Sequence, residues 1–244
     1  MILVPSVDDW WQLTREFPQF DKVSNSVLKD FGYMSLLREI KQERPIRILE
    51  FGHGFNDTVF QLSENDGDIE IWGIDDFQGL HYFPNKKEWE ARYQDKLVAR
   101  FPKTRFVRGL LGDRESKSME LPEDYFDMVC SVSVLEEVSI DVVKSIVSHS
   151  YRLLRPNGIL MGTHDICLRN LHRIKVFIDA SCECGFQCKG GVPALDGTGL
   201  LIENPTSVMV QYQRNDGEHR RYSGHWTTLL TRMVKPLAEK IGAE

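Results

Sequence analysis

The sequence has no long apolar run, because polar or charged residues interrupt every hydrophobic stretch well before the ~20 residues that a membrane-spanning helix needs. Its start, MILVPSVDDWW, lacks the basic region and the apolar segment of a secretory signal peptide. Basic residues are also few, since 30 Lys and Arg stand against 36 Asp and Glu, which gives a formal net charge of -6. This balance disfavours a broad nucleic-acid surface. We expect a globular, cytoplasmic protein with neither a membrane nor a nucleic acid as its partner.

Cysteines are scarce as well, with five in the chain. An odd number without a secretion signal fits a reducing compartment better than a disulfide framework. Three of them lie in the stretch CECGFQC, residues 182–188. This stretch fits either a zinc site or a helix end with small, soft side chains. The second interpretation is favoured, because no further pair of ligands stands at zinc-site spacing. No metal site is therefore predicted.

Strands and helices are predicted to alternate from Ile46 to His164. RPNG, residues 155–158, is interpreted as a turn between a helix and the strand that follows it. Strands that alternate with helices indicate βαβ units, right-handed crossovers and helices on both faces of a mostly parallel sheet. The predicted fold class is α/β, doubly wound. The apolar stretches that carry the strand prediction are residues 46–51, 69–75, 104–109, 124–134 and 158–164.

Both ends of the chain depart from this alternation. Apolar residues between Val27 and Ile40 recur at helical spacing, so residues 1–44 are predicted to form an N-terminal helical extension or lid. Residues 45–244 are predicted to form the main domain. Near its end, residues 200–213 and 225–234 resemble two strands joined by a polar loop. This pattern favours an antiparallel C-terminal strand pair, which brings the predicted sheet to seven strands.

The stretch ILEFGHGFND, residues 48–57, places two glycines directly after the first strand of this alternation. Ligands of open α/β sheets bind beyond the carboxyl ends of the strands, and glycines let a ligand approach the backbone. A dinucleotide fingerprint would require a third glycine where Asp57 stands. Asp57 and the preceding Glu50 would repel a pyrophosphate. An acid at this place suits a ligand with a cationic group instead.

At Glu50-Phe51-Gly52-His53-Gly54 the chain resembles the class I SAM-dependent methyltransferases. The first motif of that family is an acidic residue followed by G-x-G after the first strand. The resemblance implies that S-adenosyl-L-methionine (SAM), which carries an ammonium and a sulfonium but no phosphate, is the cofactor. Its methionine end would lie at this turn. Asn56 stands at the third position of the motif, where it tolerates unusual backbone angles.

Three later segments extend the resemblance. The second strand ends at Asp75, with Asp76 and Phe77 after it, and the family's acid at this place accepts the ribose hydroxyls. The third strand leads toward the adenine, and FDMVCSVSVLEE implies pocket-lining residues after the fourth. The predicted cofactor-binding residues are Glu50, Gly52, His53, Gly54, Asn56, Asp75, Asp76, Phe77, Leu111, Gly112, Asp113, Ser131, Val132 and Leu135.

His164 and Asp165 follow the fifth strand, so we expect both side chains to face the cleft and predict them as the catalytic residues. Two roles fit His164 there, that of a base that takes a proton from a substrate hydroxyl and that of a structural residue. Glu136 and Glu137 are interpreted as a solvated helix start. Tyr33 and residues 77–84 are candidates for the lining of the site. These residues complete the predicted site.

The family's amino methylases of nucleic acids carry N/D-P-P-Y/F after the fourth strand, whereas this chain has CSVSVLEE. The resemblance therefore implies transfer of a methyl group to a small-molecule or sugar-type acceptor, with oxygen preferred over nitrogen. One alternative is a SAM-fold protein that transfers an aminopropyl group, although Ser131 replaces the acid of that class. The other alternative is a non-catalytic binding or scaffold member. The oligomeric state, including a homodimer, is left open.

Overall fold

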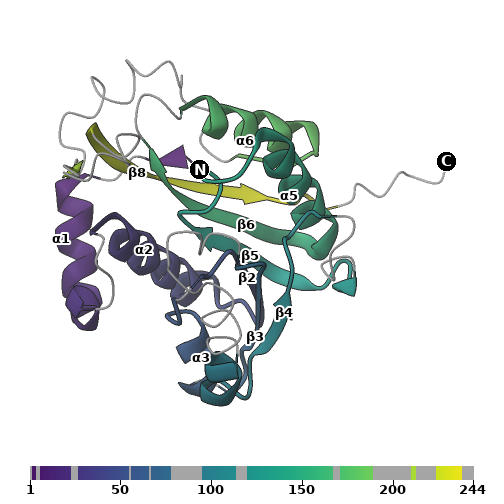
Figure 1. Cartoon of the computed structure of the whole chain (residues 1–244), viewed down its shortest axis with the longest axis horizontal. Coiled ribbons are helices and arrows are strands. Elements are labelled where there is room, and N and C mark those ends of the chain that lie inside the picture. The colour runs from purple at the N-terminus through teal and green to yellow at the C-terminus, as the bar shows by residue number, and fades with distance from the viewer. Residues whose placement is uncertain are drawn as a thin grey trace.

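A twisted β-sheet runs through the centre of the protein, with helices on both of its faces (Figure 1). The structure is a computed structural model that describes residues 2–3, 6–22, 27–54, 56–65, 67–77, 95–113, 120–166, 171–188, 210–212 and 224–237. Its strands are β1 (Ile2–Leu3), β2 (Arg47–Phe51), β3 (Glu70–Asp75), β4 (Arg105–Arg108), β5 (Phe126–Val132), β6 (Leu154–Ile166), β7 (Val210–Tyr212) and β8 (Gly224–Val234).

The strand order is β1-β8-β6-β5-β2-β3-β4, with β7 also paired to β8. β4, β3, β2, β5 and β6 are mutually parallel, whereas β8 runs antiparallel to β6 and to β7. The mostly parallel α/β sheet and the antiparallel strand pair are therefore confirmed. The predicted count of seven strands is not, because the described sheet has eight. Its additional strand is the two-residue β1, which pairs with β8 through Ile2 and Leu3.

The RPNG stretch does not separate a helix from a strand, as the sequence suggested. Residues 154–166 form one continuous strand, β6, and RPNG lies inside it. On β5, Phe126 pairs with Leu154 and Met128 pairs with Ile159, so the residues between Leu154 and Ile159 bulge out of register. Asn157 takes a φ of 65°, which an asparagine adopts more easily than most residues. Residues 155–158 do interrupt the regular strand geometry, but they form a bulge inside β6 rather than a turn before it.

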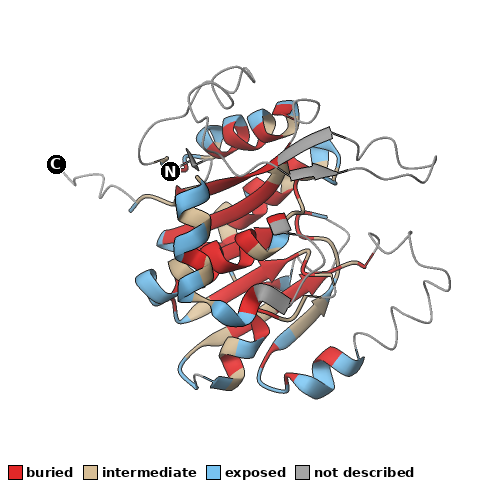
Figure 2. Ribbon diagram, turned by 90° about the vertical axis from the view of Figure 1, so that its left-hand side faces the viewer, coloured by how far each residue is buried: buried red, intermediate tan, exposed pale blue. Residues whose placement is uncertain are grey.

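Two hydrophobic cores lie on the two faces of the sheet. Helices α5 (Ile140–Leu153) and α6 (Leu171–Glu183) cover one face, and Val147 and Phe177 are fully buried there. On the other face lie α1 (Val7–Glu16), the 3-10 helix η1 (Pro18–Lys22), α2 (Val27–Glu43) and α3 (Phe60–Asn65). Figure 2 shows the buried strands between these helix layers. No helix of the described residues is long and apolar enough to cross a bilayer.

The N-terminal helices are packed into the second core. Trp10 of α1 stacks on Phe31 of α2 with ring centroids 5.9 Å apart. Gly32 brings α2 so close to the sheet that a Cβ there would lie 2.5 Å from Thr163 Oγ1. Arg232 of β8 forms ion pairs with two acids of α2, Glu39 and Glu43. The helical extension is thus joined to the sheet, and its role as a lid remains a prediction.

Some predicted segments lie partly outside the described residues. These are residues 85–94 in the connection between the second and third predicted strands, the proposed lining at 78–84, residues 200–209 and 213 of the predicted strand at 200–213, and Cys167. Residues 95–100 of the same connection are helical. Cys182, Cys184 and Cys188 lie at or just beyond the end of α6, and none of the three forms a disulfide bond with another described residue. Among the described residues there is no group of three or more side chains that could hold a metal ion.

A buried carboxylate fixes the start of the central strand. Asp127 of β5 is 9% exposed, and its Oδ2 accepts hydrogen bonds from the backbone N–H groups of Ile46 at 2.8 Å and Arg47 at 2.7 Å. Its Oδ1 forms an ion pair with Arg155 in the RPNG bulge. One side chain therefore joins the beginnings of β2 and β6 to β5.

We predict that Asp127→Ala lowers the free energy of unfolding by about 2–4 kcal/mol, because two backbone donors lose a charged acceptor. Asp127→Asn should lose less, since its amide oxygen still accepts. The control is Glu123→Ala, which breaks an exposed pair with Arg152 at 2.7 Å and should cost less than about 1 kcal/mol. Urea unfolding monitored by circular dichroism measures all three values. Equal losses for Asp127→Ala and Glu123→Ala would contradict the assignment.

Candidate functional site

The turn after β2 leaves open space beside one glycine and none beside the other. Gly52 has a φ of 66°, and a Cβ there would lie 2.5 Å from Val134 Cγ2. Gly54 has a φ of 55°, but no described atom lies within 4 Å of the place where its Cβ would be. Gly52 is thus required by conformation and by packing, whereas Gly54 exposes its backbone to a ligand. Asn56 closes the turn, since its Oδ1 accepts from Thr58 N at 2.8 Å.

Glu50 is completely buried at the end of β2, on the sheet face that α2 covers. The hydroxyl of Tyr33 from α2 donates to Glu50 Oε1 at 3.3 Å. Glu50 Oε2 has no hydrogen-bond partner among the described residues. Burial raises the pKa of Glu50 to about 8, although the Tyr33 hydrogen bond opposes the shift. The site therefore holds one buried carboxyl oxygen without a partner, which is suited to a cationic group.

Asp75 joins the ends of two neighbouring strands. Its Oδ2 accepts from Gly54 N at 2.7 Å and its Oδ1 accepts from Phe77 N at 2.5 Å. Burial raises the pKa of Asp75, and the two backbone hydrogen bonds act against that rise. Each oxygen of an ionised carboxylate can accept a second hydrogen bond. Asp75 can therefore hold the glycine turn in place and still accept bonds from ligand hydroxyls.

The His53 imidazole belongs to the core. It packs edge-on against Phe60 at 4.9 Å, Phe77 at 5.7 Å and Phe106 at 5.9 Å between ring centroids. Its Nδ1 donates to Gly54 O at 3.1 Å, and burial lowers its pKa to about 4, so the ring is neutral at pH 7. Only the backbone at this position is available to a ligand. Phe77 takes a φ of 55° and turns its ring inward, and Asp76 next to it is partly buried.

The residues after β4 pack against α5. Leu111 is buried in the core on the α5–α6 face, and a Cβ at Gly112 would lie 2.7 Å from Ile146 N of α5. Ser145 of α5 donates a short hydrogen bond to Gly112 O. Asp113 is exposed. The backbone and Asp113, rather than the Leu111 side chain, are therefore the groups that this segment offers to a ligand.

The predicted lining after β5 divides between the two faces of the sheet. Val132 lies against α2, because a Cβ at Gly32 would come within 2.8 Å of its Cγ1. Leu135 belongs to the core on the α5–α6 face. Ser131 is buried, and its Oγ has no hydrogen-bond partner among the described residues. The backbone turns sharply after Val132, since Ser133 has a φ of 55°.

The expectation that His164 and Asp165 both face the cleft is wrong for His164. Both residues lie within β6, which extends to Ile166, so their side chains point to opposite faces of the sheet. His164 is completely buried, packs on Phe177 of α6, and has a pKa lowered to about 3 by burial. Asp165 is partly buried, and its Oδ1 accepts from Thr228 Oγ1 at 3.3 Å. Burial raises the pKa of Asp165.

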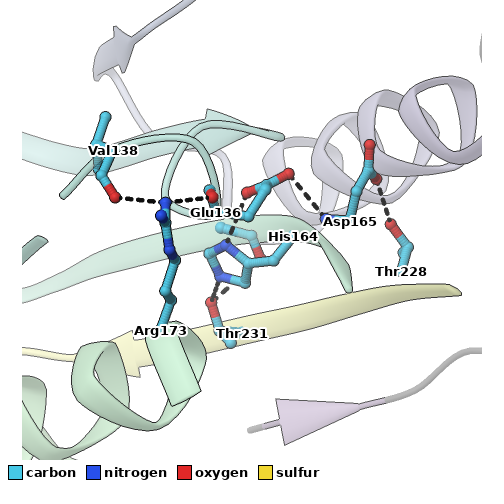
Figure 3. A network of polar contacts seen from close by, with 8 residues as sticks. Glu136, Val138, His164, Asp165, Arg173, Thr228 and Thr231 are labelled. Carbon is cyan, nitrogen blue, oxygen red and sulfur yellow. Dashed lines mark hydrogen bonds and ion pairs between the residues drawn. The ribbon is translucent and has the colours of Figure 1, made fainter. Parts of the chain in front are cut away.

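Glu136 is not part of a solvated helix start, as the sequence had suggested. It is 7% exposed, whereas the adjacent Glu137 is exposed. Its Oε1 accepts from Asp165 N at 2.9 Å, and Oε2 lies 4.0 Å from His164 Nδ1 (Figure 3). Sequence reasoning missed this residue because its partners lie on β6 and α6. The one local signal was an acid directly after the apolar VL of SVSVLEEV.

Comparisons of the sequence and of the fold with known proteins both find methyltransferases. Residues 49–162, from β2 to β6, match the family model described as "Methyltransferase domain". No curated protein matches the sequence. The N-methyltransferase NodS from Bradyrhizobium japonicum WM9, solved with S-adenosyl-L-homocysteine (SAH), superposes with a TM-score of 0.54 at 15% identity, covering 94% of this chain and 99% of that one.

A TehB-like SAM-dependent methyltransferase from Corynebacterium glutamicum ATCC 13032 superposes with a TM-score of 0.50 at 16% identity. The match covers 92% of this chain and 98% of that chain. At these identities the two structures show that the fold is shared over nearly the whole chain. The family model adds the match in sequence over the segment that contains the glycine turn and Asp75.

The raised pKa of Glu50 predicts how the stability of the folded protein changes with pH. Its folded pKa of about 8 lies above the ordinary value of 4.5, so between these pH values the folded protein binds a proton that the unfolded chain lacks. Stability is therefore lost as pH rises from 4.5 through 8. We predict that Glu50→Gln matches the wild type near pH 4.5 and is more stable by roughly 3–5 kcal/mol at pH 8.

Urea unfolding at both pH values measures this difference, and Glu120→Gln, at an exposed position, is the matched control. The control should shift neither value. A Glu50→Gln variant that is less stable than the wild type at pH 8 would show that the buried carboxyl is ionised in the folded protein.

Proposed function

We propose that this chain, which is a class I SAM-dependent methyltransferase, moves the methyl group of SAM to an oxygen atom of a small-molecule or sugar-type acceptor. The enzyme class and the cofactor are the premise, and the acceptor is the proposal. Bound SAM supplies an electrophilic methyl group on a sulfonium that is already an activated leaving group. The task left to the protein is to orient the acceptor, exclude water and receive a proton.

Two groups at the glycine turn fit the methionine end of SAM. The unpartnered Oε2 of Glu50 is a buried acceptor for the ammonium, and Gly54 leaves its backbone open beside it. Tyr33 holds the other oxygen of Glu50 from the side of α2. We assign Glu50 as the residue that recognises the cationic end of the cofactor. The burial that raises its pKa would be compensated by the ammonium, since an opposite charge nearby favours the ionised carboxylate.

Asp75 is assigned to the ribose hydroxyls. Its two oxygens are oriented by the N–H groups of Gly54 and Phe77. A carboxylate held in this way loses little further conformational freedom when it accepts two hydroxyl donors. Because the Asp75 carboxylate both holds Gly54 in the glycine turn and is assigned to the ribose hydroxyls, a change in the turn would also change ribose recognition.

The observation that supports an oxygen acceptor is the position of Asp165. Glu50 pairs in register with Cys130 of β5, and Cys130 pairs with Met161 of β6, so these three residues share the sheet face that α2 covers. Asp165 stands four positions after Met161 on the same strand and therefore points to the same face, nearer the carboxyl end. A hydroxyl acceptor must lose its proton as the carbon–oxygen bond forms, and Asp165 is a carboxylate placed to receive it. A neutral amine needs such a base less.

We predict that Asp75→Asn weakens SAH binding at least about tenfold, because the amide oxygen replaces only part of the acceptor capacity of the carboxylate. Calorimetric titration with SAM and with SAH measures the change, and circular dichroism verifies the fold. Asp68→Asn, on an exposed turn, is the matched control and should bind like the wild type. Unchanged SAH affinity in Asp75→Asn would remove Asp75 from the cofactor site.

For the acceptor, we predict that a panel of hydroxylated small molecules and sugars supports faster SAH release than the matching amines. Asp165→Asn should lower kcat about 100-fold and leave SAH affinity unchanged, since a general base contributes in this range. The wild-type rate should rise with pH as Asp165 loses its proton, and the rate of the Asn variant should not. Faster turnover of amines, together with full activity of Asp165→Asn, would overturn the oxygen assignment.

A further inference from the structure

A buried pair formed by Glu136 and His164 lies beneath the loop at residues 133–139, which connects β5 to α5 (Figure 3). Glu136 Oε1 accepts from Asp165 N at 2.9 Å, which ties the loop to the end of β6. Arg173 of α6 donates to the carbonyls of Glu136 and Val138, at 2.7 Å each. The loop is therefore bound to a strand and to a helix that both follow it in the chain.

Hydrogen-bond accounting places the protons of this pair. The Thr231 hydroxyl donates to Gly162 O at 3.2 Å, so its oxygen is the acceptor for His164 Nε2–H at 2.9 Å. His164 Nδ1 then carries a lone pair, and it faces Glu136 Oε2 at 4.0 Å. Neither of these two atoms has a hydrogen-bond partner among the described residues. Two acceptor atoms that face each other at this distance repel, and a proton on Glu136 Oε2 would remove that repulsion.

Electrostatics agrees with a neutral pair rather than an ion pair. Burial, with the nearby Asp165 carboxylate, raises the pKa of Glu136 well above its ordinary value. Burial lowers the pKa of His164 to about 3. Glu137 adds further negative charge, and the Arg173 guanidinium is directed to the carbonyls rather than to the carboxyl group. Both shifts favour the uncharged forms of the two side chains.

The same loop, residues 133–139, also packs against the glycine turn after β2. Val134 fills the space above Gly52, where a Cβ would come within 2.5 Å of its Cγ2. Ser133 N donates to Thr163 O at 2.8 Å, and Glu137 N donates to Val134 O at 2.9 Å. A loop held at both Ser133 and Glu136 keeps Val134 against Gly52. The contact sequence thus runs from α6 through Glu136 and Val134 to the turn at which the methionine end of SAM is proposed to bind.

We propose that Glu136, in its protonated form, is a positioning residue that holds the 133–139 loop against Gly52 and thereby sets the shape of the cofactor turn. The proposal rests on the cofactor site proposed above. Glu136 does not touch the cofactor in this scheme, and it acts through Val134. Its carboxyl group accepts one hydrogen bond from Asp165 N through Oε1, and a proton on Oε2 would face the lone pair of His164 Nδ1 across 4.0 Å.

The test uses a side chain with the same hydrogen-bonding capacity and no ionisable proton. Glu136→Gln keeps an oxygen for Asp165 N and supplies an N–H for His164 Nδ1, whereas Glu136→Ala removes both. Glu137→Gln, at the adjacent exposed position, is the matched control. SAH affinity is measured by calorimetry at pH 7.5, the melting temperature by circular dichroism, and the His164 tautomer in the wild type by 15N NMR, assigned through His164→Asn.

We expect Glu136→Gln and Glu137→Gln to bind SAH as the wild type does. Glu136→Ala should bind about tenfold more weakly, because a buried donor loses its acceptor and the loop is released. The wild-type spectrum should show His164 protonated at Nε2 alone. If Glu136→Ala fails to fold, the Gln variant and the NMR spectrum decide the question.

Three results would each overturn the inference. One is a Glu136→Gln variant as weak as Glu136→Ala, which would mean that a charge is needed. Another is a His164 ring protonated at both nitrogens, which would indicate an ion pair. The third is a Glu136→Ala variant that melts at a lower temperature but binds SAH with full affinity, which would make the role purely structural. Failure of both the wild type and Glu137→Gln to bind SAH would instead remove the cofactor site on which the inference rests.

Discussion

Carboxyl groups buried at the carboxyl end of the parallel strands are the constraint on which the rest of this site depends. An ionised carboxylate away from water is costly unless it is paired, hydrogen-bonded or protonated. Each buried carboxyl group of the site is stabilised in a different way. Asp75 accepts hydrogen bonds from two backbone N–H groups, Glu136 accepts from Asp165 N and has a pKa raised by burial, and Asp165 accepts from Thr228. Glu50 and Glu136 each have one oxygen without a hydrogen-bond partner among the described residues, and the oxygen of Glu136 faces His164 Nδ1 at 4.0 Å.

These different solutions separate the acids by role. A carboxyl group satisfied by protein donors contributes to the fold, because its hydrogen bonds join elements that are distant in sequence. A carboxyl group left incomplete destabilises the protein until a ligand completes it, and strain of this kind is typical of functional sites. Tyr33 lowers the energetic cost of burying Glu50 but does not remove it, because its hydroxyl donates a hydrogen bond to only one of the two carboxyl oxygens. The geometry of the glycine turn is thus supported by Asp75, and the preference for a cationic ligand that we propose for this turn comes from Glu50.

The sequence predicts the alternation of strands and helices, the antiparallel strand pair and the glycine turn, because these depend on local periodicity and on residue types that dictate backbone angles. It does not predict β1, since a two-residue strand has no periodicity and forms only through its pairing with β8. His164 was misplaced because β6 continues two residues beyond the expected end and the side-chain alternation turns its ring inward. Glu136 resembles a surface residue in the stretch VLEEV, and its burial depends on β6 and α6, which come later in the chain.

The clamp between α2 and β8 has a consequence for biosynthesis. Arg232 joins β8 to Glu39 and Glu43 on the helix that presents Tyr33 to Glu50. β1 likewise finds its partner on β8, near Leu230 and Thr231. A ribosome must therefore have made the chain through β8 before these ion pairs and the β1–β8 pairing can form. During translation the parallel strands emerge before β8, so the contacts that tie α2 to β8, beside the proposed cofactor site, form late.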